Sequence, residues 1–183
     1  YLRRFARIEF CIGLLFSGIS CVLFFAGILN LLRAAAWALF LFGLILAANS
    51  VKQRNRAHGI LCAGTVFFLL LLVLFPALLY GSAFTHNDNF SHWAVAAKVV
   101  IDSHRFPSFQ DDFIMFPSYP LGSACFIYYF TQIVGASAEW IQMYAQAILM
   151  AGMLTSLFVF CGKKLSSLLT AFFCLCLLCS NNS

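Results

Sequence analysis

The stretch GILCAGTVFFLLLLVLFPALLY, residues 59–80, decides the fold class of this chain. It contains no charged side chain, and a helix crosses the roughly 30 Å hydrocarbon core of a bilayer in about 20 residues. Pro76 lies near the end of the stretch, where the loss of a backbone hydrogen bond is most easily tolerated. The stretch therefore predicts a transmembrane helix.

The composition of the whole chain excludes a soluble globular protein. Of the 183 residues, 63% are hydrophobic and 9% are charged, whereas soluble domains are about half apolar and about a quarter charged. The formal net charge is +5, but the basic residues lie between apolar runs, where they orient spans, so we expect no nucleic-acid partner. The eight cysteines lie in or beside apolar segments, where a thiol packs as a small hydrophobe, and no disulfide framework is expected.

Four further apolar runs predict membrane-crossing helices, and a shorter one predicts a different arrangement. The four runs are Ile8–Leu32, Ala34–Ser50, Glu139–Cys161 and Leu165–Cys179. The shorter run, Leu121–Gly135, has the length at which an interfacial or re-entrant helix is as common as a span. The chain starts without Met and stops in a polar tail, so we expect it to be part of a longer protein.

The basic residues predict the orientation of these helices. Cytoplasmic segments carry an excess of Lys and Arg, and an interfacial Leu121–Gly135 leaves the fewest basic residues outside. We therefore predict an all-α, polytopic transmembrane helical bundle of the plasma membrane, with five spans, a cytoplasmic N-terminus and residues 81–120 outside. The basic residues predicted inside are Arg3, Arg4, Arg7, Lys52, Arg54, Arg56, Lys163 and Lys164, and those outside are Arg33, Lys98 and Arg105.

Most of the polar chemistry lies in the outer segment, residues 81–120. Candidate catalytic residues are therefore expected there. The segment holds four of the six acids and three of the four histidines, namely Asp88, Asp102, Asp111, Asp112, His86, His92 and His104. His86 and His104 are expected to be ordinary loop residues.

The first part of this segment, Asp88–Asp102, has the periodicity of an amphipathic helix. We predict that this helix lies in the membrane surface, with Trp93 at the level of the headgroups. Its apolar face comprises Phe90, Trp93, Ala94, Ala97, Val100 and Ile101, and its polar face comprises Asp88, Ser91, His92, Lys98 and Asp102.

Asp88 and His92 are four residues apart on the polar face. A carboxylate beside an imidazole is a usable acid–base or metal-binding pair. The alternative is that Asp88, or Asn87 before it, caps the helix, because Asp and Asn are favoured at that position. One residue can perform both roles.

The second part of the segment is rich in turns and contains the adjacent acids Asp111 and Asp112. Such a pair is typical of a solvated turn, and the alternative is a site for a divalent cation, which prefers oxygen ligands. Lys98 and Arg105 offer positive charge to a phosphate near the membrane surface.

The order of these features resembles the membrane glycosyltransferases of the GT-C superfamily, particularly bacterial enzymes that use polyprenyl-phosphate-linked sugars. The resemblance covers roughly residues 59–180. It divides the chain into an N-terminal transmembrane hairpin, residues 1–58, and part of a GT-C-like domain, residues 59–183, with an outer loop (81–120) and a juxtamembrane helix (121–135). The matching pieces are Gly59–Tyr80, Asn87-Asp88, Ser91-His92-Trp93, Tyr119-Pro120-Leu121-Gly122, Leu121–Gly135 and Gly162-Lys163-Lys164-Leu165.

Two departures from the family pattern affect the expected chemistry. Asn87-Asp88-Asn89 replaces the common Asp-Glu pair, and Leu121 stands where the second proline usually is. The first departure leaves one carboxylate at that point, so the resemblance does not settle whether a divalent cation is used.

The resemblance implies a reaction and assigns roles to residues. Asp88 would be the general base that deprotonates an acceptor hydroxyl, which attacks the sugar C1 while the lipid phosphate leaves. His92 would orient Asp88 or touch the sugar, Lys98 or Arg105 would bind the phosphate, and Trp93 and Tyr119 would contact substrate. The partners would be a polyprenyl-phosphate-linked sugar in the bilayer and a glycan or protein acceptor of the cell envelope.

Two other classes remain open from the sequence. One is a transporter or polymer-export subunit in which the outer segment is only a folded cap. Transporters usually place ionisable residues within spans near the midplane, whereas Glu9 and Glu139 lie at span ends. The other is a polysaccharide polymerase or ligase of another membrane fold.

Overall fold

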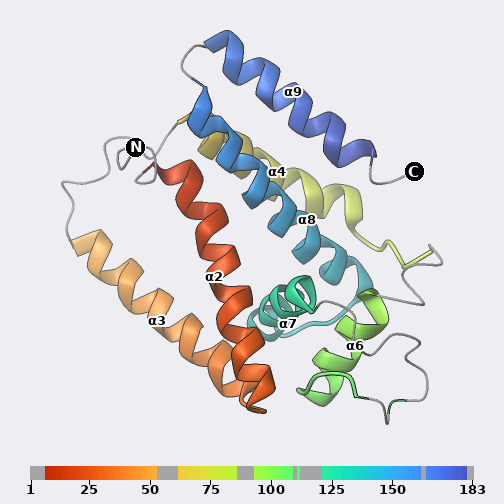
Figure 1. The fold of residues 1–183 in the computed structure, drawn as a ribbon. Coiled ribbons are helices and arrows are strands. Elements are labelled where there is room, and N and C mark those ends of the chain that lie inside the picture. Colours follow the sequence, from red (N-terminus) through yellow and green to blue (C-terminus); the bar gives the residue numbers. More distant parts are fainter. Residues whose placement is uncertain are drawn as a thin grey trace. The chain divides into compact units, whose positions relative to one another are not determined.

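The computed structural model describes residues 7–52, 62–85, 93–108, 111, 121–161 and 164–180, and in these ranges every regular element is a helix (Figure 1). This confirms the all-α prediction for the described part of the chain. The elements are α2 (Ile8–Ile28), α3 (Leu32–Lys52), α4 (Ala63–Leu79), α6 (Trp93–Ser103), α7 (Gly122–Val134), α8 (Glu139–Thr155), the 3₁₀ helix η2 (Ser156–Phe160) and α9 (Lys164–Ser180).

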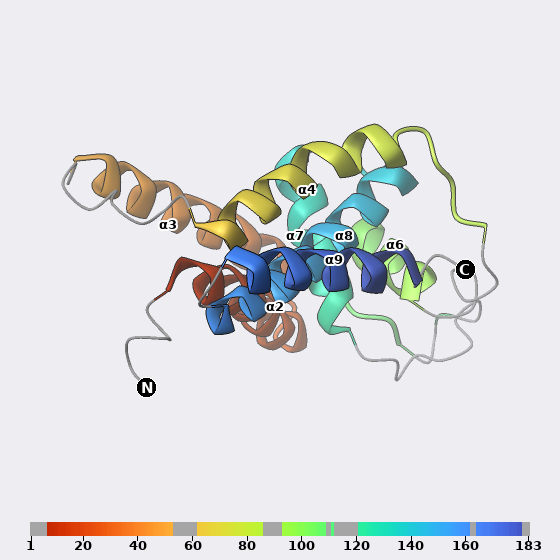
Figure 2. The same ribbon diagram turned by 90° about the horizontal axis from the view of Figure 1, so that it is seen from above.

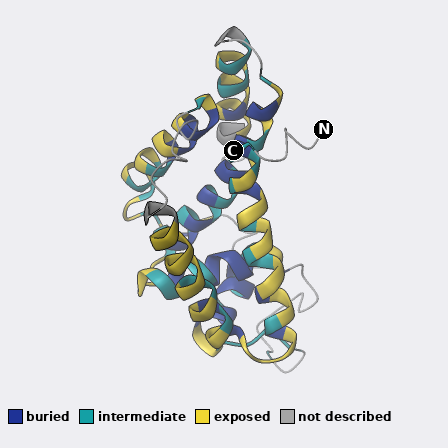
Figure 3. Cartoon of the chain, turned by 90° about the vertical axis from the view of Figure 1, so that its left-hand side faces the viewer, coloured by how far each residue is buried: buried dark blue, intermediate teal, exposed yellow. Residues whose placement is uncertain are grey.

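Three helical stretches of the described chain are long and apolar enough to cross a membrane. They are Ile8–Ile28, Leu32–Asn49 and Glu139–Phe160. Two shorter apolar helices, Ala63–Leu79 and Ser166–Leu177, lie where the sequence predicts two more spans. Most described side chains of α3 are exposed (Figure 3), among them Leu41, Phe42 and Ile45. An apolar surface of this extent indicates membrane association.

The described helices belong to two compact units. The first comprises residues 1–16, 55–78 and 147–183, and the second comprises residues 17–54 and 79–146. In the first unit, the start of α2 is grouped with α4, with α9 and with the end of α8. In the second unit, the rest of α2 is grouped with α3, α6 and α7. The boundary at residues 58 and 59, which rests on the family resemblance, stays a prediction.

In the first unit, a buried carboxylate lies beside a glycine. Glu9 is 2% exposed and accepts a hydrogen bond of 2.8 Å from Arg7 Nη2, while Arg7 Nη1 donates to the carbonyl oxygen of Val159 at 2.9 Å. A Cβ built on Gly64 would lie 2.6 Å from Glu9 Cγ and 2.9 Å from Phe158 Cβ. The missing side chain of Gly64 therefore lets α4 approach α2 and η2 closely.

We expect Gly64→Ala to destabilise the protein by about 1–3 kcal/mol, the usual cost of overpacking a core, because Phe158 is itself buried. Gly18→Ala in α2 is the matched control, since a Cβ there would meet nothing within 4 Å. Thermal unfolding in detergent compares the two variants. Equal midpoints would contradict the close packing at Gly64.

In the second unit, α6 and α7 pack against each other (Figures 1 and 2). Of the predicted apolar face, Ala94, Ala97, Val100 and Ile101 are buried and Trp93 is partly buried, while Phe90 lies outside the described residues. Ala96 and Val99 of α6 are buried as well. The exposed fraction is 1% for Ala94 and 0% for Ala97 and Val100. The sequence predicts that this face meets the membrane surface. In the structure it packs against α7, whose buried residues include Ala124, Cys125, Ile127 and Tyr128.

Helix α7 matches the predicted juxtamembrane helix Leu121–Gly135 to within one residue at each end. Gly135 ends it with a φ of 72° and donates its N–H to the carbonyl oxygen of Thr131 at 2.9 Å. This left-handed geometry favours glycine. The 13 residues of α7 extend about 20 Å, which is shorter than the roughly 30 Å hydrocarbon core.

Candidate functional site

The structure describes half of the residues that the sequence assigned to a site. Trp93, Lys98, Arg105 and Asp111 lie within the described ranges. Asp88, His92, Tyr119 and Asp112 lie outside them. The assignment of Asp88 as base or helix cap, and of Asp112 as cation ligand, therefore stays a prediction.

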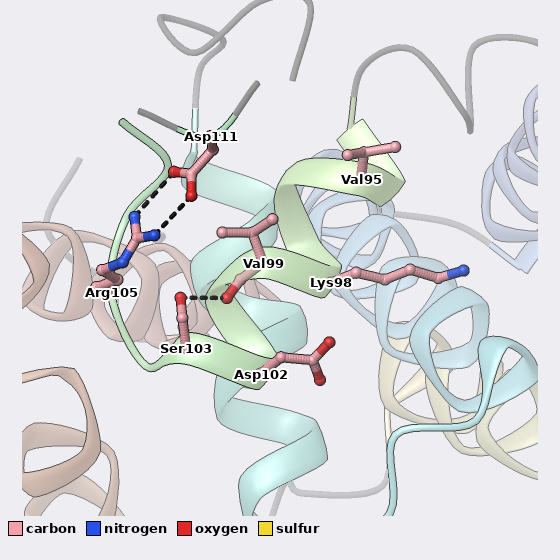
Figure 4. A pocket seen from close by; sticks show the side chains of 7 residues that line it. All are labelled: Val95, Lys98, Val99, Asp102, Ser103, Arg105 and Asp111. Atoms are coloured by element: carbon pink, nitrogen blue, oxygen red, sulfur yellow. Dashed lines mark hydrogen bonds and ion pairs between the residues drawn. The ribbon is translucent and has the colours of Figure 1, made fainter. Parts of the chain in front are cut away.

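A shallow depression of about 450 Å³ lies on the polar face of α6 (Figure 4). Most of its lining comes from α6 positions spaced by three or four residues, which share one face of a helix. It brings together the predicted residues Lys98, Arg105 and Asp111, with Asp102 and Ser103 beside them. The full lining is Val95, Lys98, Val99, Asp102, Ser103, Arg105 and Asp111.

One side of the depression is a loop closed by an ion pair. Arg105 donates two hydrogen bonds to Asp111, Nη1 to Oδ2 at 2.9 Å and Nη2 to Oδ1 at 2.6 Å. Asp111 Oδ2 also accepts the backbone N–H of Ser108 at 2.7 Å. The loop turns away from α6 at His104, which has a φ of 54°. The pair thus fixes the backbone that follows the helix.

These contacts change the acid–base properties of both partners. The hydrogen bonds from Arg105, with that from the Ser108 N–H, hold the pKa of the Asp111 carboxyl well below its ordinary value. The same pair raises the pKa of Arg105. The Asp111 oxygens are thus already engaged by donors. Within the described ranges, no three His, Cys, Asp or Glu side chains cluster as a metal site would require.

The lowered pKa predicts how the loop responds to acid. The charged Asp111 stabilises the loop fully above its ordinary pKa of 3.8, and this stabilisation is lost as the pH falls through the lower folded-state pKa. We expect Asp111→Asn to speed backbone hydrogen exchange several-fold at pH 7 at His104 and Ser108, whose N–H groups are hydrogen-bonded. The wild-type loop should stay protected down to about pH 4. Wild-type protection in the variant would contradict the role of the ion pair.

Lys98, which also lines the depression, is tied to the start of α8. Lys98 Nζ donates to Glu139 Oε1 at 2.6 Å, and the backbone N–H of Phe84 donates to Glu139 Oε2 at 2.7 Å. Lys98 Nζ also lies 5.2 Å from the centre of the Phe84 ring, which makes a T-shaped contact with the Trp93 ring at 5.3 Å between centres. Glu139 was not among the predicted site residues. An acid in the first turn of an apolar helix, where the helix dipole favours it, is the sequence signal that marks it.

Two contacts anchor the segment after α6 to its surroundings. His104 Nδ1 and the Tyr128 hydroxyl lie 3.1 Å apart, and burial raises the pKa of that hydroxyl. The Phe106 ring lies 5.7 Å from that of Phe24 and occupies the space that a side chain at Gly27 would need. His104, predicted to be an ordinary loop residue, therefore links α6 to α7.

Comparisons with protein-family models, curated proteins and solved structures found no match to this chain. The resemblance to GT-C glycosyltransferases therefore stays a prediction that rests on the order and spacing of the motifs.

Proposed function

We propose that this chain belongs to a polytopic glycosyltransferase of the plasma membrane. It transfers a sugar from a polyprenyl-phosphate donor to an acceptor of the cell envelope on the outer face. The observation that carries the proposal is the depression on α6, whose lining includes two cationic side chains, Lys98 and Arg105, and two carboxylates, Asp102 and Asp111. Such a surface can bind a phosphate and sugar hydroxyls at the same time.

The proposed membrane arrangement has five spans and a cytoplasmic N-terminus. It is supported by the three long apolar stretches, by the apolar character of α4 and α9, and by the basic residues that precede α2 and α4. Helix α7 lies at the outer interface, because its length is insufficient for a span. In this arrangement α6 and its depression are at the level of the outer headgroups, where a lipid-linked phosphate lies.

We expect single-cysteine labelling to support this topology. In a cysteine-free background, cysteines at positions 88 and 112 should react with an impermeant reagent applied from outside, and a cysteine at position 163 should be protected. The reason is the asymmetry of basic residues across the proposed spans. Labelling of position 163 from outside would mean that the 121–135 segment crosses the membrane.

The proposed reaction assigns the chemistry as follows. Asp88 takes the proton of an acceptor hydroxyl, the acceptor oxygen forms a bond to the sugar C1, and the bond between C1 and the phosphate oxygen breaks. The lipid phosphate leaves with the electron pair of that bond. Lys98 and Arg105 stabilise its charge, as preorganised cations do for developing anions. Each is held by a carboxylate, Glu139 and Asp111 respectively, and retains further N–H donors.

A transfer assay on the full-length protein tests the proposal. The protein is reconstituted in vesicles with a radiolabelled polyprenyl-phosphate hexose and a membrane extract that supplies acceptors. We expect label to move from the donor lipid to a product, with release of polyprenyl phosphate. Movement of intact donor between leaflets without cleavage would instead support the transporter class and would refute the transferase.

A further inference from the structure

We propose that Asp102 binds the hydroxyl groups of the sugar in the depression on α6. This inference rests on the proposed function, because it names the residue that distinguishes a sugar-bearing lipid from a bare lipid phosphate. Asp102 lies on the rim of the depression, where Figure 4 shows it and Lys98 on one side of the helix and the Arg105–Asp111 pair on the other.

The first argument is availability. Among the acids that the structure describes, Glu9 pairs with Arg7, Asp111 with Arg105 and Glu139 with Lys98. Asp102 is exposed and has no ion pair or hydrogen bond with any described residue. Lys98 lies one turn before it, but the Lys98 ammonium is directed to Glu139. The Asp102 carboxylate therefore keeps its acceptor capacity for a ligand.

The second argument is local energetics. Asp102 lies in the last turn of α6, which ends at Ser103, and a negative charge near a helix C-terminus opposes the helix dipole. A Lys four residues before an Asp is also the less favourable order for such a pair. The carboxylate thus weakens the helix that carries it.

The third argument is the distribution of apolar and polar groups over the lining of the depression. Val95 and Val99 form apolar lining between the polar groups, and such lining suits the apolar face of a sugar ring. The Ser103 hydroxyl donates to the carbonyl oxygen of Val99 at 2.6 Å, and the Asp111 oxygens accept from Arg105 and Ser108. The Asp102 carboxylate is therefore an acceptor in the depression that is available to sugar hydroxyls.

The test measures binding of three probes by the full-length protein in detergent: decaprenyl phosphate, decaprenyl-phosphate mannose and decaprenyl-phosphate glucose. The wild type should prefer at least one sugar-bearing lipid over decaprenyl phosphate. Asp102→Asn should lower affinity for that lipid about 10-fold, because a neutral amide oxygen accepts weaker hydrogen bonds than a carboxylate does. Affinity for decaprenyl phosphate should stay equal or rise, because a negative charge near the phosphate is removed.

Thermal unfolding of the same variants separates binding from structure. Asp102→Asn should have an unchanged or higher midpoint than the wild type, whereas Glu139→Gln, which breaks the Lys98 pair, should have a lower one. A lower midpoint for Asp102→Asn would overturn the inference, as would an unchanged preference for the sugar-bearing lipid. A wild type that binds none of the three probes would overturn the proposed function itself.

Discussion

Replacing Asp88 by asparagine is expected to lower sugar transfer by roughly 10²–10⁴-fold, the usual contribution of general-base catalysis, while folding and membrane insertion stay normal. The substitution separates the two roles that the sequence allows for Asp88. Asparagine caps a helix as well as aspartate does, but its amide cannot accept a proton at neutral pH. Turnover per correctly inserted molecule is therefore the quantity to measure.

Two controls define what the loss at Asp88 means. His92→Ala should lose less activity, because His92 orients Asp88 or touches the sugar. If a divalent cation is used, the double variant Asp111→Asn, Asp112→Asn should lose more activity than loosening of the loop alone would cause. Without a cation, it should lose no more than that. Wild-type turnover in an inserted Asp88→Asn protein would remove Asp88 from the mechanism.

Replacing Ala97 by aspartate is expected to unfold or strongly destabilise the second unit. Ala97 is 0% exposed and lies in the buried cluster shared by α6 and α7. A carboxylate there would be buried without a partner, which costs about 3–5 kcal/mol. Because native stability is only about 5–15 kcal/mol, most of the margin would be lost.

The matched control for Ala97→Asp is Val95→Asp, two residues earlier on the same helix. Val95 is partly exposed and lines the open depression, so its carboxylate would stay hydrated. The variants are compared by thermal unfolding and by protease sensitivity of residues 93–134. Equal destabilisation by both substitutions would contradict the packing of α6 on α7.

The positions of the helices could be predicted from the sequence because apolar runs and helical periodicity are local properties. Their ends were less predictable in continuous apolar sequence. The run predicted as Ile8–Leu32 ends as a helix at Ile28, and Asn30, with a φ of 58°, makes the turn into α3. Asparagine tolerates this left-handed conformation, and its place in the run is the signal that marks the turn.

The partners within the site could not be predicted, because they depend on tertiary structure. Periodicity identified the buried face of α6, but not that α7 covers it. Lys98 and Arg105 were chosen for their charge, yet the carboxylate that holds Lys98, Glu139, lies 41 residues away in the sequence. Asp102 stands out only once the pairs made by the other described acids are known. Sequence patterns indicate which groups are polar, and packing decides which of them stay available.

The central claim, that sugar transfer takes place at the depression on the outer face, is tested most directly by blocking the depression from outside. In a cysteine-free background of the full-length protein, Ser103→Cys places a thiol at the exposed edge of the depression. Ser137→Cys places one in the exposed connection between α7 and α8, away from the depression lining. Both positions face outward in the proposed topology, so an impermeant, negatively charged thiol reagent applied to intact cells should label both. We expect transfer to be abolished in the labelled Ser103→Cys protein and retained in the labelled Ser137→Cys protein. Undiminished transfer after complete labelling of position 103 would contradict the account.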